Sequence, residues 1–83
     1  MMDISETEFR AALDAPLPEG FAMPRGSESE WQAVDFQRAA NVKFLMMGRV
    51  DKRFPNYRPT LSILESAFQR YTRKARQMRA AIN

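Results

Sequence analysis

The residues best suited to binding chemistry are concentrated in the stretch DKRFPNYRPT, between positions 51 and 60. Its guanidinium and ammonium groups can bind phosphate or carboxylate oxygens, and arginine and tyrosine are among the types most enriched at protein–protein hot spots. The candidates in this stretch are Lys52, Arg53, Phe54, Tyr57 and Arg58. The sequence allows two interpretations of them: an exposed contact for a partner, or a rigid corner made by Pro55 and Pro59 with the aromatic rings tucked beneath it. It leaves open whether the Phe54–Pro55 bond is cis.

A second basic group lies near the end of the chain. Arg70, Arg73 and Arg76 recur every three residues, which is a spacing that a helix places on neighbouring positions of its surface. These arginines can contact a phosphate backbone or an acidic protein surface, or they can simply be solvated. No helix-turn-helix pattern accompanies them, so any nucleic-acid binding would be independent of base sequence. We expect the loop residues and these three arginines to supply one partner-binding surface.

Several kinds of chemistry are excluded by composition. The chain has no cysteine and no histidine, so disulfides, thiolate metal sites and histidine-based nucleophile activation are ruled out. We therefore expect no catalytic, cofactor-binding or metal-binding residues, and the sequence predicts a protein that is not an enzyme. The absence of cysteine also suggests a reducing compartment.

Charge is distributed unevenly along the chain. Residues 1–35 contain eight acids and two bases, whereas residues 36–83 contain eleven bases and two acids. The N-terminal segment MMDISETEFR is acidic and lacks an apolar stretch, which predicts no signal peptide, and no apolar run approaches the length of a membrane span. We expect a soluble, cytoplasmic protein with no membrane partner. Its basic half either binds an anionic partner or is neutralised by the acidic half.

These residues must be positioned by helices. Ser5 and Glu8 have the spacing of a capping box and predict a helix over 6–14. Residues 15–29 are rich in proline and glycine and predict a linker that lies as an ordered strap across the helices. Ser27 with Glu30, or Ser29 with Gln32, predicts the start of a second helix over 30–47. A basic, aromatic loop over 48–60 then leads to a long helix over 61–82.

The last helix carries the strongest periodic signal. Apolar residues recur in steps of three and four, which is a heptad seam: Leu61, Leu64, Phe68, Tyr71, Ala75, Met78 and Ile82. A parallel coiled-coil dimer is disfavoured because Lys74 and Arg79 would face each other across the two chains. We expect instead one all-α domain, 1–83, in which the seam packs on the second helix as an antiparallel hairpin.

The hairpin makes further predictions about individual side chains. It places acids near the start of the second helix beside bases near the end of the last one, which suits both helix dipoles. Asp35 and Arg38 are expected to pair at the margin of the core. The helix faces around Phe44 and Ile63 are expected to stay uncovered in so small a hairpin, which makes self-association plausible.

No motif in the chain is specific to a known family. Its plan of two helices with Pro55 and Pro59 bracketing the connection resembles the small helical-hairpin subunits of type III secretion needles, although the final helix is shorter and more basic here. Small basic helical proteins also occur among phage and mobile-element products. We expect a non-enzymatic binding module that docks on an acidic protein as an adaptor, a host-factor inhibitor or an assembly subunit. The alternative is a sequence-independent DNA- or RNA-binding protein.

Overall fold

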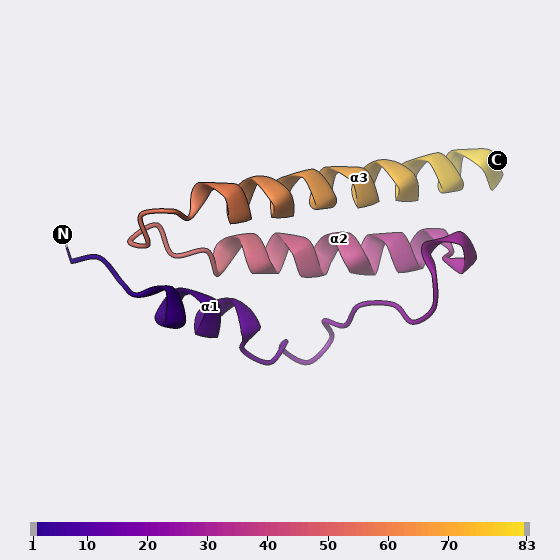
Figure 1. The fold of residues 1–83 in the computed structure, drawn as a ribbon. Helices are drawn as coiled ribbons and strands as arrows, with labels where there is room; N and C mark the ends of the chain where they lie inside the picture. Colours follow the sequence, from indigo (N-terminus) through magenta and orange to yellow (C-terminus); the bar gives the residue numbers. More distant parts are fainter. Residues whose placement is uncertain (1, 83) are drawn as a thin grey trace.

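The computed structural model describes residues 2–82, and it is all-helical over that range (Figure 1). Two long helices, α2 (Ala33–Gly48) and α3 (Arg58–Ile82), pack against each other as an antiparallel hairpin. A short helix, α1 (Glu6–Asp14), lies near the loop end of the hairpin, and a single 3₁₀ turn, η1 (Glu28–Glu30), lies near the other end. The predicted all-α class and the predicted helical hairpin are confirmed.

Helix α1 has the bounds that its capping residues predict. The Ser5 hydroxyl accepts a hydrogen bond from the backbone N–H of Glu8 at 3.1 Å, which satisfies one of the free donors of the first turn. Phe9 and Leu13, four residues apart, share the buried side of the helix. The helix ends before Pro16, because the residue before a proline avoids the helical region.

The segment between α1 and η1 is an ordered strap that runs back along α2 (Figure 1). It turns where the N–H of Phe21 donates to the carbonyl of Pro18 at 3.1 Å. Gly20 is at the third position of this turn with φ of 89°, a conformation that favours glycine. The strap is tied at its far end by the indole N–H of Trp31, which donates to the Arg25 carbonyl at 3.2 Å.

The start of the second helix differs from its prediction. Residues 28–30 form η1, Trp31 is extended, and α2 begins only at Ala33. The predicted serine caps are wrong: Ser27 and Ser29 bond to each other, while Gln32 caps the helix and its N–H donates to the Asp35 carboxylate at 2.9 Å. The reason is Trp31, which is 7% exposed and reaches the core from an extended backbone.

Helix α3 begins at Arg58, three residues before the predicted start at 61. Pro59 lies in its first turn, where the missing N–H costs nothing because that donor would have no partner within the helix. The connection contains no cis peptide bond, so Phe54–Pro55 is trans.

Two small cores hold the hairpin together. One, at the η1 end, is built from aromatic rings and closely approaching alanines: Trp31, Phe36, Ala39, Ala40, Tyr71 and Ala75. The other, at the loop end, joins α1 to the hairpin through Phe9, Leu13, Val50 and Leu64. Six residues of the predicted heptad seam, Leu61 to Met78, are buried or half-buried in or beside these cores. The side chain of Ile82 lies outside the described residues.

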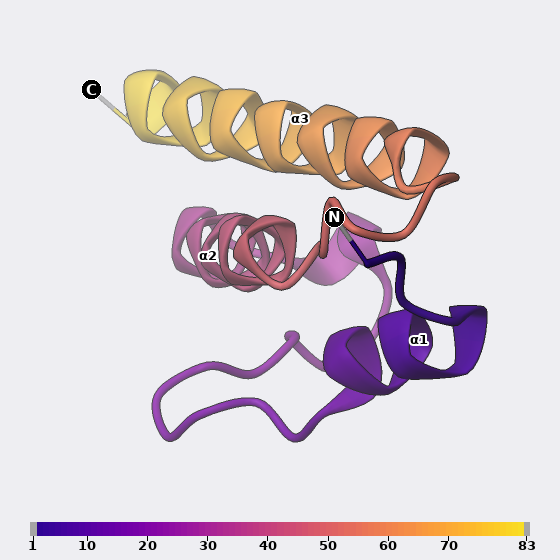
Figure 2. The ribbon, with the colours of Figure 1, turned by 90° about the vertical axis from the view of Figure 1, so that its left-hand side faces the viewer.

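The elements are arranged in layers. Viewed along the hairpin, α3 lies over α2, while α1 and the strap lie beneath and to one side of α2 (Figure 2). Asp35, which lies beside the strap, and Phe44 are nine residues apart, about 180° around α2 at 100° per residue. The side of α2 that carries Phe44 is therefore left uncovered.

Candidate docking surface

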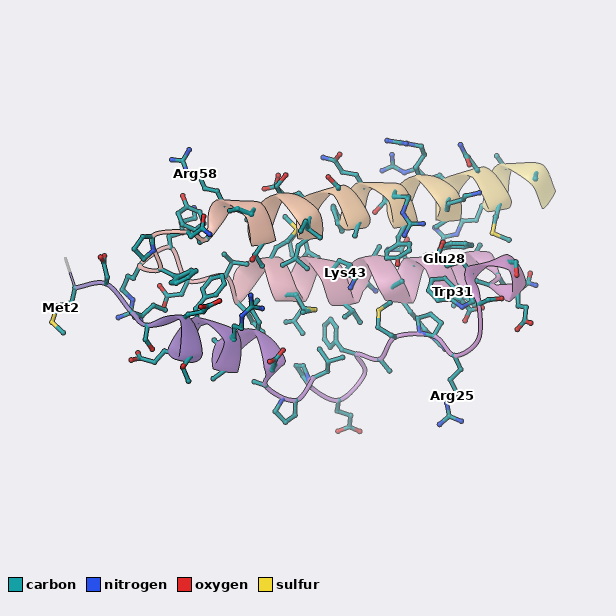
Figure 3. The ribbon with its side chains drawn as sticks, viewed as in Figure 1. Met2, Arg25, Glu28, Trp31, Lys43 and Arg58 are labelled. Atoms are coloured by element: carbon teal, nitrogen blue, oxygen red, sulfur yellow. The ribbon has the colours of Figure 1, made fainter. Side chains whose placement is uncertain are left out.

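The loop residues predicted to bind a partner have different roles in the structure. The Arg53 guanidinium pairs with the Asp51 carboxylate, with 2.7 Å between Nη2 and Oδ2. This hydrogen bonding lowers the pKa of Asp51 and raises that of Arg53. Lys52 and Arg58 are exposed, and Arg58 extends away from the loop end of the hairpin (Figure 3).

The two loop aromatics are half-buried instead of freely exposed. The ring of Phe54 stacks on that of Phe9 with centroids 4.4 Å apart. Tyr57 packs against the same core, and Arg58 lies over its ring with 5.9 Å between Cζ and the ring centroid. The corner interpretation therefore accounts for most of the apolar surface of Phe54 and Tyr57.

Arg70 is tied to the fold by an acid distant in sequence. Its two terminal nitrogens donate to both Glu28 carboxylate oxygens, at 2.8 and 3.0 Å, and its guanidinium lies over the Tyr71 ring, 4.5 Å from the centroid. The hydrogen bonds from Arg70 lower the pKa of Glu28, and burial raises the pKa of Tyr71. Glu28 and Trp31 lie together at the end of the hairpin opposite Arg58 (Figure 3).

Arg73 and Arg76, on the C-terminal half of α3, make no ion pair with any described acid. They line a shallow pocket of about 260 Å³ on the side of α3, together with Phe68, Gln69 and Thr72. The pocket thus combines two free guanidinium groups with an aromatic ring and neutral polar groups.

Helix α2 continues this surface. Phe44 is 63% exposed, and its ring lies 5.5 Å from that of Phe68, centroid to centroid. Asn41 lies one turn and Gln37 two turns before Phe44, and the Gln37 amide donates to the Asn41 side-chain oxygen at 3.1 Å. The Gln37 side-chain oxygen also accepts from Arg79 of α3 at 3.5 Å. We call this side of the hairpin the open face, defined by Gln37, Asn41, Phe44, Phe68, Gln69, Thr72, Arg73 and Arg76.

The loop residues and the arginines of α3 do not form one compact surface. Arg58 and Arg73 are separated by fifteen residues of α3, about 22 Å along the helix axis at 1.5 Å per residue. The sequence predicted that the helix face around Phe44 stays uncovered, but Phe44 was not among the predicted partner-binding residues. Its repeat with Gln37 and Asn41 in steps of four and three is the signal that could have identified it.

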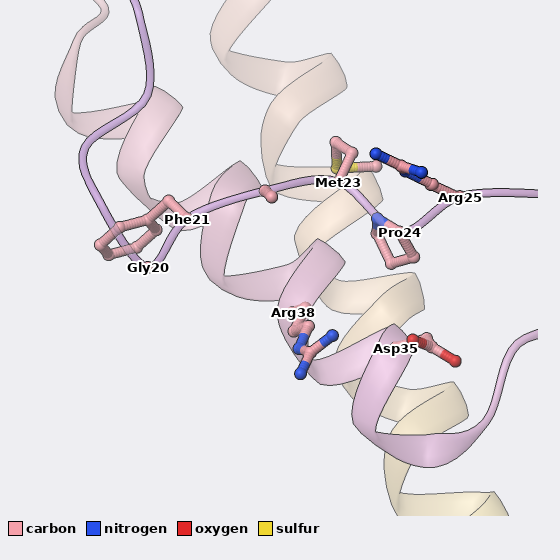
Figure 4. Close-up of a pocket in the computed structure, with 8 residues that line it drawn as sticks. Gly20, Phe21, Met23, Pro24, Arg25, Asp35 and Arg38 are labelled. Carbon is pink, nitrogen blue, oxygen red and sulfur yellow. The ribbon is translucent and has the colours of Figure 1, made fainter.

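A larger hollow lies between the strap and α2 (Figure 4). It has a volume of about 630 Å³, with Phe21, Met23 and Pro24 on the strap side and Asp35 and Arg38 on the α2 side. The predicted ion pair between Asp35 and Arg38 is wrong, because the Asp35 carboxylate instead accepts from the N–H of Gln32 at the start of α2. The side chain of Arg25, on the strap, points away from the hairpin (Figure 3).

Neither a metal-binding cluster nor a buried charged side chain occurs within residues 2–82. No helix in this range is both long and apolar enough to cross a membrane. Neither a known protein family, nor a curated protein, nor a solved structure matches the chain.

Proposed function

We propose that this protein is a non-enzymatic binding module that docks on an acidic protein partner through the open face. The observation that carries the proposal is the position of Arg73 and Arg76 on α3. Both flank the pocket beside Phe68, and neither has a carboxylate partner among the described residues. Arginine and aromatic side chains in a shared pocket are characteristic of protein–protein hot spots.

The other basic residues predicted to bind a partner are less suited to it, because of the contacts that they or their neighbours make within the chain. Arg53 binds Asp51 and Arg70 binds Glu28, so both are partly neutralised within the chain. Lys52 and Arg58 are exposed, but the aromatic rings beside them, Phe54 and Tyr57, pack against the core at the loop end of the hairpin. The proposed docking site therefore lies on the C-terminal half of α3 and not in the loop.

Sequence-independent nucleic-acid binding is the second candidate, and it rests on the regular row of Arg73, Arg76 and Arg79. Arg79 already donates to Gln37, which leaves a short row for a phosphate backbone. If the arginines contact phosphates, affinity should fall steeply as the salt concentration rises, and each basic side chain that is removed should weaken binding by a similar amount. A docked protein predicts instead that one aromatic contact dominates.

The test is a capture experiment with two charge-reversed variants. The doubly substituted Arg73→Glu/Arg76→Glu protein is compared with Lys52→Glu/Arg58→Glu, which changes net charge equally at exposed positions of the loop end. Both are used as bait in lysate from the source, with and without nuclease, after circular dichroism has verified their folding. A nuclease-resistant protein that the first variant loses and the second retains supports the proposal.

Two other results count against it. If the captured proteins are lost after nuclease treatment, the arginines bind nucleic acid instead of a protein. A protein lost equally with both variants shows that net charge, and not the open face, determines the capture.

A further inference from the structure

The hairpin already binds one acidic amphipathic helix, its own α1. That helix carries Glu6, Glu8 and Asp14 against Arg10, and it buries Phe9 and Leu13 against Val50 and Leu64. Phe9 is 1% exposed, so its side chain is fully desolvated in this contact. The chain thus shows how a short acidic helix with apolar residues at i and i+4 packs at the loop end of the hairpin, against loop residues and the start of α3.

The open face also presents aromatic side chains, on the uncovered side of α2. Phe44 stands exposed beside Phe68, and a pocket borders Phe68 along α3. Gln37, Asn41 and Phe44 form a ridge at helical spacing. A third helix packs its side chains into the grooves beside such a ridge, and here the ridge meets the α3 pocket where Phe44 contacts Phe68.

Charge indicates which helix would fit. The pocket on α3 is bordered by Arg73 and Arg76, which have no described acidic partner, and Arg79 follows one turn further on. The helical repeat places one acid, Glu65, in the same row. In a two-fold dimer through this face, the surface would contact an identical surface. Basic side chains would outnumber acidic ones on both sides, so most of them would lack an acidic partner. An acidic occupant matches the face, and a second copy does not.

We propose that the open face seats an acidic amphipathic helix of the partner protein. Its apolar stripe lies against Phe44 and Phe68, and its carboxylates face Arg73 and Arg76. This inference rests on the proposed function and specifies the structural element that the partner presents. It is the helix-in-groove mode of recognition, in which apolar anchors at i, i+3, i+4 and i+7 enter a hydrophobic furrow.

The probe is a synthetic helix of roughly three heptads, with leucine at positions a and d and glutamate at e and g. A second peptide has the same composition, with the leucines dispersed around the helix, and a third has lysine in place of glutamate. Binding to the full chain is measured by fluorescence anisotropy, and the contacted residues are mapped by amide chemical shifts. We expect the first peptide alone to bind, with shifts concentrated at Asn41, Phe44, Phe68 and Thr72.

Two single substitutions locate the contact. Phe44→Ala is expected to weaken binding of the acidic amphipathic peptide by at least about thirtyfold, the size of a hot-spot loss. Ile63→Ala removes a side chain that is 70% exposed on α3 outside the pocket, and it is expected to leave affinity unchanged. Because Phe44 is itself exposed, its replacement should leave the fold intact, which circular dichroism checks.

The outcomes separate this inference from the function on which it rests. The helix groove is overturned if the dispersed peptide binds equally well. It is also overturned if Phe44→Ala leaves binding unchanged while Arg73→Glu/Arg76→Glu abolishes it. Either result still agrees with docking to acidic partners. Binding that does not depend on the two arginines contradicts both proposals. No binding of any peptide overturns the groove, whereas the capture experiment still decides the function. If analytical ultracentrifugation shows a dimer that the Phe44→Ala substitution dissociates, the open face binds a second copy of the chain, and the helix-groove inference is overturned.

Discussion

The ring of Phe9 stacks on the ring of Phe54 with centroids 4.4 Å apart and an angle of 27° between the ring planes. The two residues come from α1 and from the loop between α2 and α3, so this contact joins distant parts of the chain. Together with Leu13, it attaches the acidic helix to the loop end of the hairpin. Phe54, which the sequence offered as a residue for contacting a partner, thus packs against the core at the loop end.

Replacing Phe9 should reveal how much of the stability depends on this attachment. Phe9→Ala removes a side chain that is 1% exposed, and we expect the free energy of unfolding to fall by about 3 kcal/mol, the usual size for a buried phenylalanine. Urea denaturation followed by circular dichroism measures the change. Thr7→Ala, at an exposed position of the same helix, is the control. A loss below about 1 kcal/mol for Phe9→Ala would show that α1 contributes little to the folded state.

Local sequence signals predicted the helices well. The Ser5–Glu8 spacing gave α1 its bounds, and the heptad repeat identified the side of α3 that meets α2. The signals misplaced the start of α2, because burial of Trp31 in the tertiary structure outweighed two serine caps that are equally good locally.

The candidate site was less predictable, for a physical reason. Whether an arginine is free depends on acids brought near it by the fold, and Arg70 meets Glu28 across 42 positions of sequence. In the same way, Phe54 is covered by a helix that precedes it by some forty residues. Residue types that could bind a partner can therefore be read from the sequence, but which of them remain unpaired and exposed depends on the fold.

Arg49 fixes the end of α1 to the end of α2. Its guanidinium donates to the carbonyls of Ala15 and Pro16 at 2.6 and 2.9 Å. Because these bonds are charge-assisted but exposed, we expect Arg49→Ala to cost about 1 kcal/mol. Hydrogen exchange should accelerate at the amides of residues 6–14 more than in α2 or α3. Arg38→Ala, which replaces an exposed arginine within α2, is the control, and equal exchange in the two variants would contradict the role of Arg49.

The pair of Glu28 and Arg70 predicts a small pH dependence of stability. Hydrogen bonds from Arg70 lower the pKa of Glu28 from its ordinary value of 4.5, so in acid the unfolded chain binds this proton more readily than the folded chain. The stabilisation is therefore fully present above pH 4.5 and is lost as the pH falls through the folded-state pKa. Its size is expected to stay below about 1 kcal/mol, since both side chains are well exposed.

Glu28→Gln tests this assignment. It should lower the unfolding midpoint in urea at neutral pH and leave it almost unchanged in strong acid, where the wild-type pair is already lost. Glu30→Gln, on the same turn, has no arginine partner among the described residues and is the control. An equal effect of Glu28→Gln at both pH values would mean that its cause is not the ionised pair.

Thr72 offers a substitution that should not destabilise the protein. Its Oγ1 is buried and has no hydrogen-bond partner within the described structure, a situation that carries a desolvation cost. Valine has nearly the same shape and is also β-branched, so Thr72→Val should leave stability unchanged or raise it by up to about 1 kcal/mol. Thr72→Ser keeps the hydroxyl and removes the methyl group, so it should be less stable than wild type. The urea midpoints of the two variants give the comparison, and a marked loss in Thr72→Val would show that the hydroxyl is hydrogen-bonded in solution.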